Sequence, residues 1–457
     1  MIDKLRSIFK VKELREKIGF VLLMLLVCRI GAYITVPGIN GELILKSFRA
    51  AIGGGQNLFQ FVDVFTGGAF AKMTLVALGV MPYITASIFI QLLMGLVPSL
   101  QREIKESAEA GKRKLGIWTR ILTLFIAIFQ SGLYAKQALG FNIATPGIIF
   151  PEFIEVTAFG VPWLFYLITI VSMTTGTLFL MWIGEQITEK GIGNGMSMII
   201  SLGILSALPR TLGSILTGLN IDSQDAGQLT LTSLIVLSFI FVGIIVGTIM
   251  VLQGIRKIPI QYARRNVEST GNQAKTPFIP LKINFAGIMP VIFASSFLMF
   301  PATVALLLKN YPVISKIAGY ISPGTNGYMI AFVSLIILFT FIWTSMQFRP
   351  DQIASDMKKS GAFIPGVRQG KPTEEHIQHS MTRITCIGAF FLAFIAILPT
   401  RVGKLLAIDP TISQFFGGTS ILILVGVILD SSKQIESHLI MQKYDGFMSQ
   451  GKMTGKF

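Results

Sequence analysis

The sequence has little charge and few of the side chains that carry out chemistry. Only 14% of its 457 residues are charged, and it has three histidines and two cysteines. It lacks His-Glu-x-x-His, a P-loop and a Gly-x-Ser-x-Gly nucleophile elbow, so it offers no metalloprotease, nucleotide or α/β-hydrolase site. His376 and His379 could in principle face one metal, but we expect them to lie in a solvated loop because convergent ligands are missing. These absences predict a protein that is not an enzyme and has no cofactor.

Cys28 and Cys386 both fall in or at apolar runs, which indicates packing residues rather than a disulfide framework or a metal site. The amino-terminal segment is basic and then apolar, like a signal peptide. Its apolar stretch is long, however, and no small-x-small cleavage site follows it. We therefore expect this stretch to remain as a first membrane span.

Long apolar runs dominate the rest of the chain, with 52% hydrophobic residues and a mean hydropathy of +0.67. A helix needs roughly 20 apolar residues to cross a bilayer. Ten such runs begin near Gly19, Thr74, Ile117, Val161, Ile192, Leu229, Ile283, Tyr328, Ile384 and Gly417. They are continuous rather than alternating, so the sequence predicts ten transmembrane helices and no β-barrel.

Ionisable side chains are missing from the interiors of these runs, with Arg29 as the exception. Proton relays and many ion-coupled carriers need carboxylates or histidines at membrane depth, so a proton-driven pump is disfavoured. We expect Arg29 to reach a polar neighbour or backbone carbonyls inside the bundle, and we assign it no transport role.

The net charge of +16 is unevenly distributed along the chain. Most Lys and Arg residues fall in the two terminal segments and in the connections after the second, sixth and eighth runs. Connections on one side of the membrane alternate with those on the other, and the basic ones face the cytoplasm. This bias predicts that both termini are cytoplasmic.

The chain also contains an internal repeat. Met81-Pro-Tyr-Ile-Thr-Ala-Ser87 recurs as Met289-Pro-Val-Ile-Phe-Ala-Ser295, and Gly195-x-Ser-x-x-Ile-x-x-Gly203 recurs as Gly418-x-Ser-x-x-Ile-x-x-Gly426. Two halves of five spans each must have opposite orientations in the membrane, which is the inverted-repeat plan of membrane translocators. We therefore expect the function to lie where the halves meet.

Four isoleucines occupy matching positions in the repeat: Ile84 with Ile292, and Ile200 with Ile423. Packed core is the simpler interpretation of each one alone. Their pairing favours a hydrophobic constriction, which blocks water and ions by dewetting and yields to a large object. Such a seal suits a polymer better than an ion.

The stretch from Asn57 to Lys72 is too short to cross a membrane. Its Phe-rich pattern predicts a small amphipathic helix, followed by a flexible Gly67-Gly68 pair. A helix on the membrane surface and a re-entrant element between the halves are about equally supported.

Several longer motifs resemble one family. They are Phe65-Thr-Gly-Gly-Ala-Phe70, Ala77-Leu-Gly-Val-Met-Pro-Tyr-Ile-Thr-Ala-Ser-Ile88, Gln91-Leu-Leu93, Gly184-Glu-Gln-Ile-Thr-Glu-Lys-Gly-Ile-Gly-Asn-Gly195, Pro280-Leu-Lys-Ile-Asn-Phe-Ala-Gly287, Lys359-Ser-Gly-Ala-Phe-Ile-Pro-Gly366 and Phe416-Gly-Gly-Thr-Ser420. In this order they resemble the SecY family of protein-conducting channel subunits, in its bacterial form. The resemblance implies an all-α membrane protein in which two inverted five-helix halves form a clamshell around a central pore, with a short plug helix.

The resemblance also implies the roles of particular residues. The pore ring falls on Val80, Ile84, Met196, Ile200, Ile292 and Ile423. Val80 and Met196 depart from the isoleucine that is commonest there, but both are apolar. The plug covers about 59–72 with its hinge at Gly67 and Gly68. The lateral gate carries Gln130 and Asn284, whose alternative role is simple interhelical hydrogen bonding, and both roles can hold at once.

The family's partners follow from the same resemblance. The basic loops would dock the ribosome, through its RNA phosphates, or the motor ATPase SecA, with Arg264, Arg265 and Arg368 at the contact. The small subunits SecE and SecG would brace the clamshell, and SecDF and YidC are further partners. Signal sequences, unfolded preproteins and membrane lipids would be the remaining contacts, in the bacterial plasma (inner) membrane.

The expected organisation has four parts: a cytoplasmic segment at 1–18, a first half at 19–219, a second half at 220–437 with cytoplasmic loops at about 254–282 and 348–383, and a cytoplasmic tail at 438–457. Two other classes stay open. A secondary carrier would share the inverted repeats, but it would need polar, ion-coordinating backbone at mid-membrane. An insertase or scaffold would share an apolar groove, but it would lack a plug.

Overall fold

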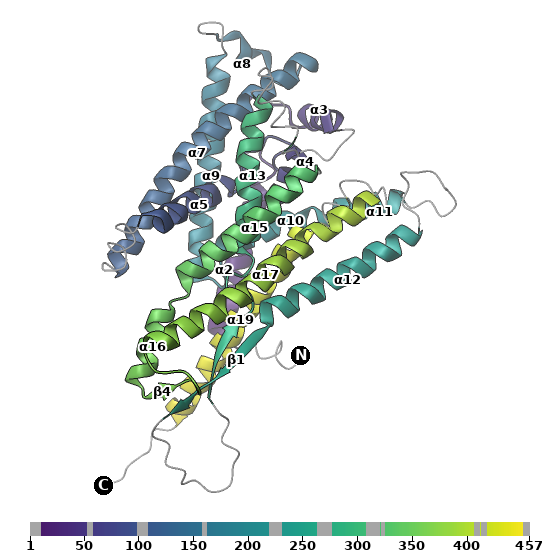
Figure 1. Ribbon diagram of the computed structural model, residues 1–457. Coiled ribbons are helices and arrows are strands. Elements are labelled where there is room, and N and C mark those ends of the chain that lie inside the picture. Colours follow the sequence, from purple (N-terminus) through teal and green to yellow (C-terminus); the bar gives the residue numbers. More distant parts are fainter. Residues whose placement is uncertain are drawn as a thin grey trace.

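The computed structural model describes residues 11–52, 58–97, 108–157, 162–218, 231–262, 277–307, 320, 325–405, 412 and 418–450. The helices are α2 (Lys12–Gly31), α3 (Gly41–Ile52), α4 (Leu58–Thr66), α5 (Met81–Leu96), α7 (Ala108–Ala144), α8 (Pro151–Glu155), α9 (Trp163–Lys190), α10 (Gly195–Ser206), α11 (Leu208–Gly218), α12 (Leu231–Gln253), α13 (Met289–Leu307), α15 (Asn326–Gln347), α16 (Pro350–Lys359), α17 (Lys371–Leu405) and α19 (Gly418–Gln450). The strands are β1 (Ile255–Pro259), β2 (Gln261–Tyr262), β3 (Phe278–Lys282) and β4 (Ala362–Phe363). Figure 1 shows α16, β1 and β4 at one end of the long helices and α3 and α8 at the other.

Each of the ten predicted runs contains a helix: α2, α5, α7, α9, α10, α12, α13, α15, α17 and α19. In the described part of the chain, seven helical segments are long and apolar enough to cross a membrane, and α5 and α13 contribute shorter apolar helices. Several helices extend beyond the apolar run. α17, for example, begins at Lys371, well before the predicted start near Ile384, because its first turns are polar and lie outside the apolar stretch.

Two helices begin later than the sequence predicts. The apolar runs start near Thr74 and Ile283, whereas α5 begins at Met81 and α13 at Met289. Before α5 the chain makes successive turns, and their backbone groups are paired locally or with the segment that follows α2, as when Leu75 N–H donates to Ile34 O. Irregular backbone is tolerated at membrane depth only when it is buried in protein in this way.

The central core joins the two halves of the chain. Its buried side chains come from α2, α5, α9 and α10 of the first half and from α12, α13, α15, α17 and α19 of the second. α5 packs against α13, and α10 packs against α19. The partners in both pairs carry the repeated motifs, so the repeat lies at the contact between the halves.

The loops after α12 and α15 form one folded unit, which the sequence did not predict. β1 pairs with β3 in an antiparallel sheet within the first loop, and β2 pairs with β4 across the two loops. The unit has its own core, which includes Ile258, Leu281, Met357, Ile364 and Ile377. We name these described parts of 255–282 and 348–384 the loop unit.

Candidate functional site

The structure brings together the six residues that the resemblance places around a pore. Val80 is the N-cap of α5 and Ile84 lies in its first turn, Met196 and Ile200 lie in α10, Ile292 lies in α13, and Ile423 lies in α19. Five of them are at most 5% exposed and belong to one hydrophobic cluster, and the partly buried Met196 packs against it. We name these six residues the ring. Their role as a constriction stays a prediction.

The helices that carry Ile84 and Ile292 begin with the same backbone conformation. Gly79 has a φ of 59° and Gly287 a φ of 63°, and in each case the Met-Pro pair starts the helix two residues later. Glycine adopts this left-handed conformation at little cost, and proline is favoured in the first helical turn. The repeat therefore extends to the turns that aim these two isoleucines.

Matching glycine contacts place α10 and α19. A Cβ on Gly195 would collide with the carbonyl oxygen of Gly184 in α9, and a Cβ on Gly418 would collide with that of Ile395 in α17. Each helix thus starts in direct backbone contact with the helix that precedes it in the repeat. Ile200 and Ile423 lie the same number of residues further along and reach the ring from the two halves.

Two cavities meet at the ring. The larger has a volume of about 410 Å³ and is lined by Ile84, Met196, Ile200 and Ile292 among others. The smaller, of about 40 Å³, is lined by Val80, Ile200 and residues of α4. Ile200 contributes to both, so the two hollows adjoin at this residue of the ring.

The larger cavity has one polar and one apolar wall. The first half supplies the polar wall, with Ser87, Gln91 and a bidentate ion pair between Arg120 and Glu185. Arg120 Nε donates to Glu185 Oε1 at 3.0 Å, and Arg120 Nη2 donates to Glu185 Oε2 at 2.8 Å. The second half supplies apolar side chains, including Trp343. Such a hollow can accept a chain that carries both kinds of side chain.

The segment 58–72, which we name the plug segment, lies inside the molecule. α4 packs against α10 of the first half and α13 of the second, and Val62 and Phe65 are buried. After Thr66 the chain turns through Gly67 (φ 67°) and Gly68 (φ 85°). The sequence predicted helix followed by a Gly-Gly bend but left surface and re-entrant placements open, and the structure shows the internal one.

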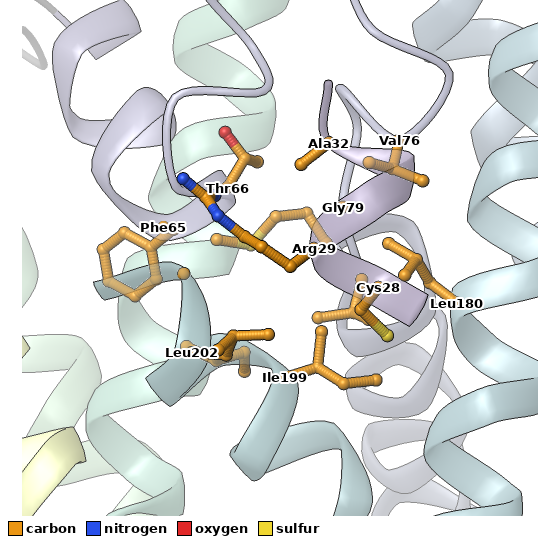
Figure 2. Close-up of a pocket in the computed structure, with 14 residues that line it drawn as sticks. Cys28, Arg29, Ala32, Phe65, Thr66, Val76, Gly79, Leu180, Ile199 and Leu202 are labelled. Carbon is orange, nitrogen blue, oxygen red and sulfur yellow. The ribbon is translucent and has the colours of Figure 1, made fainter. Parts of the chain in front are cut away.

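Arg29 lies over the carboxyl end of α4, within the plug segment. Its Nη1 donates to the carbonyl oxygen of Gly67 at 2.9 Å, and its Nη2 lies 3.4 Å from the hydroxyl of Tyr33. Figure 2 shows this side chain reaching across the smaller cavity, with its nitrogen atoms beside Thr66. The sequence indicated a carbonyl or polar partner for Arg29 but did not predict which one, because any residue can supply a backbone carbonyl.

The two predicted gate residues lie in different surroundings. Gln130 is partly buried on α7, whereas Asn284 is 4% exposed in the turn before α13. Asn284 Nδ2 donates to Gly287 O at 2.7 Å, and its Oδ1 is buried with no hydrogen-bond partner among the described residues. Between the halves, α5 contacts α13 and α15, and we name the contact between α5 and α13 the seam. There the Ser296 hydroxyl lies 3.6 Å from the sulfur of Met81. The gate role of both residues stays a prediction.

The predicted docking residues are only partly described. Arg264 and Arg265 lie outside the described residues. Arg368 is exposed in the turn between β4 and α17, where its carbonyl accepts a hydrogen bond from the Thr373 hydroxyl at 2.7 Å. Its charge is therefore presented by a fixed turn of the loop unit.

Within the described ranges, no group of three or more His, Cys, Asp or Glu side chains could hold a metal ion. The prediction of a loop around His376 and His379 is wrong, because both lie exposed in the first turns of α17. Lys371 and Pro372 begin this helix ahead of them, which is a usual position for proline.

Comparison with known proteins decides the relationship. A family model described as SecY matches residues 74–432, well over half of the chain. The chain belongs to the SecY family. It is 52% identical over 453 residues to the protein translocase subunit SecY of Chlamydia trachomatis serovar D, with 99% of each chain covered.

Solved structures support the same fold for this member of the SecY family. A structure described as that of a protein conducting channel matches with a TM-score of 0.62 at 18% identity, covering 92% of this chain and 91% of the other. Sec61 in the canine ribosome-channel complex from the endoplasmic reticulum matches with a TM-score of 0.58 at 17% identity, with the same coverage. The fold is thus the multi-pass helical clamshell predicted for a SecY-family protein, which is a channel family and not an enzyme family.

Proposed function

We propose that this protein is the pore subunit of a protein-conducting channel in the bacterial plasma membrane. It translocates unfolded secretory proteins and releases transmembrane segments sideways into lipid. The observation that carries the proposal is the ring: six apolar side chains from both halves pack together, five of them line two cavities that adjoin at Ile200, and residues of α4 line the smaller cavity.

The chemistry of the ring fits a seal for a polymer. Aliphatic side chains bind water poorly, so a narrow aliphatic constriction empties of water and stops ions. The ring is assembled from four helices, α5, α10, α13 and α19, that contain no cysteine and so have no disulfide between them, which lets the ring widen around a chain. Met196 is unbranched and flexible, which softens the seal on the side of α10.

The seam between α5 and α13 provides the sideways exit. Apolar side chains of both helices pack there, and the Ser296 hydroxyl meets the sulfur of Met81 at 3.6 Å, a weak interaction that is broken at little cost. Gln130 and the buried Oδ1 of Asn284 lie on the elements that flank this seam. We propose that these polar groups set how apolar a segment must be before it leaves the channel.

Partners supply the energy. The loop unit presents Arg256, Lys257, Lys282, Arg368 and neighbouring basic residues, which suit the motor ATPase SecA or ribosomal RNA. The positive-inside bias places this unit and both termini in the cytoplasm. SecE and SecG brace the helices, and SecDF and YidC act beside the same channel.

The function is tested by reconstitution. The chain is placed in vesicles with SecE and SecG, and ATP-dependent import of a signal-bearing precursor is measured by protease protection with added SecA. Protected precursor should disappear when SecA or the signal sequence is omitted. Absence of protection, with the same partners active beside a channel of known activity, contradicts the proposal.

The ring is tested by a matched pair of variants. Ile423 and Leu422 are neighbours on α19, and each is 0% exposed, but only Ile423 belongs to the ring. Ile423→Ser and Leu422→Ser should each lower stability by about 2–5 kcal/mol. Only Ile423→Ser should raise small-ion leak through the idle channel, by about tenfold, which corresponds to roughly 1.4 kcal/mol in the barrier. Equal leak in both variants contradicts the assignment of the ring.

A further inference from the structure

Arg29 stands out because it is a cation inside a predicted span that neither the ring nor the gate uses. It lies in the last turn of α2 and is half buried in the wall of the smaller cavity. Its guanidinium lies 5.1 Å from the ring centroid of Tyr33, and Lys72, at the end of the plug segment, lies 4.9 Å from the same centroid. The aromatic ring thus holds Arg29 in place by cation–π attraction.

The carbonyl oxygen of Gly67, which accepts the hydrogen bond from Arg29, lies at the carboxyl end of α4, where a cation is favoured. Gly68 N–H donates to Asp63 O at 2.8 Å and Gly67 N–H donates to Val64 O at 3.3 Å, and Gly67 is left-handed. These bonds form a Schellman motif, so α4 ends here with the negative end of its dipole. The motif uses the carbonyls of Asp63 and Val64 and leaves that of Gly67 pointing outward, where Arg29 takes it.

Helix α10 of the first half supplies the other contacts around Gly67, and we name this surface, formed by Arg29 and α10, the plug seat. A side chain at Gly67 would collide with the hydroxyl of Ser206 in α10, and the backbone at Phe65 lies against Gly203 of the same helix. Ser206 donates mainly to Gly203 O at 2.7 Å and lies 3.4 Å from Gly67 O. Arg29 is therefore the main donor to the Gly67 carbonyl among the described residues.

The geometry points to Arg29 as the positioning residue of the plug: its guanidinium, steadied by Tyr33, caps α4 at Gly67 and holds the plug segment on the first half of the chain. This inference rests on the proposed function and adds a step to it. Parting α5 from α13 removes the second-half contact of α4 but leaves the bond from Arg29 intact. Release of the plug is then a separate event that requires this bond to break.

The test measures release of the plug directly. In a chain with Cys28→Ala and Cys386→Ala, the buried Val64 of α4 is replaced by cysteine, and its rate of modification by a membrane-impermeant maleimide is followed in vesicles. Arg29→Met removes both the positive charge and the N–H donors of the guanidinium. Arg29→Lys keeps the charge but not the guanidinium geometry, and Tyr33→Phe removes the hydroxyl but keeps the aromatic ring. Ile148→Cys, buried outside the plug segment, reports general loosening.

Arg29→Met should raise the modification rate at position 64 about tenfold or more, since hydrogen bonds to charged groups are the strong ones. Arg29→Lys should give an intermediate rate, and Tyr33→Phe should stay within about twofold of the parent because its long hydroxyl contact contributes little. The rate at position 148 should not change. In import assays, Arg29→Met should improve translocation of a precursor with a weakened signal.

Two results overturn the inference. One is an unchanged rate at position 64 in Arg29→Met. The other is an equal rise at positions 64 and 148, which indicates a structural role for Arg29 in the whole bundle. Because the maleimide rates need no transport, they decide the inference even if import of the intact precursor fails, whereas that failure bears on the proposed function.

Discussion

Replacing Gly203 with alanine should displace the plug segment from α10 with only a small loss of overall stability. A Cβ at this position would lie 3.0 Å from the carbonyl carbon of Phe65 and closer still to its oxygen. The neighbouring atoms are backbone, so a side-chain rotation cannot relieve the collision. Atoms in ordinary contact need about 3.5 Å, so α4 and α10 must separate by on the order of 1 Å.

The magnitude follows from two opposing effects. Overpacking of this kind costs about 1–3 kcal/mol, and α4 can avoid the cost by leaving its seat. Alanine is better than glycine in a helix by about 1 kcal/mol, but α10 gains this whether or not the plug is seated. The seated state should therefore lose a factor of about 5 to 150 against the displaced state. The net loss of stability should not exceed about 2 kcal/mol, the overpacking cost less the helix gain, so the unfolding temperature should stay level or fall by only a few degrees.

The assay is small-ion leak through the idle reconstituted channel, together with the thermal unfolding midpoint. Gly243→Ala is the matched control, because it lies inside α12 and a Cβ there meets nothing within 4 Å. It should gain helix stability and leave the leak unchanged. Equal leak in the two variants, or a fall of the unfolding temperature by more than about 10 °C in Gly203→Ala alone, refutes the reasoning.

Two further predictions concern the gate and the docking surface. Asn284→Leu removes a buried oxygen without a described partner, a group that costs about 1–3 kcal/mol. The seam should become more stable, and precursors should need more hydrophobic signals for export; an unchanged threshold across a graded signal series argues against a gate role. Arg368→Glu reverses an exposed charge outside the core of the loop unit, so SecA-driven import should fall several-fold while purified complex yield stays the same. Equal losses of import and yield point to a folding role.

The sequence predicted the meeting of the halves because the repeated motifs carry the contact. Gly79 and Gly287 are two residues before the Met-Pro pairs, and the structure gives them the same left-handed turn. The late starts of α5 and α13 were missed because a buried apolar turn has the same hydrophobicity as a buried helix. Hydropathy alone cannot separate the two.

The sequence could not predict hydrogen bonds to backbone groups that are far apart along the chain. The pairing of β2 with β4 joins Gln261 to Phe363, and such short strands leave no periodic pattern. The bond from Arg29 to Gly67 is similar, since the acceptor is a carbonyl that every residue carries. Composition indicated that Arg29 needs a partner, but only the fold shows that the partner is the end of α4.

The loop unit has a mechanical consequence. Its two loops are joined by the β2–β4 pairing and by a shared core, and they continue into α12, α13, α15 and α17. A load applied to either loop is therefore borne by all four helices at once. α13 contacts both α5 and α4. A small tilt of the loop unit at one end of the molecule would therefore shift the contact between α5 and α13 and the contacts of α4 at the same time.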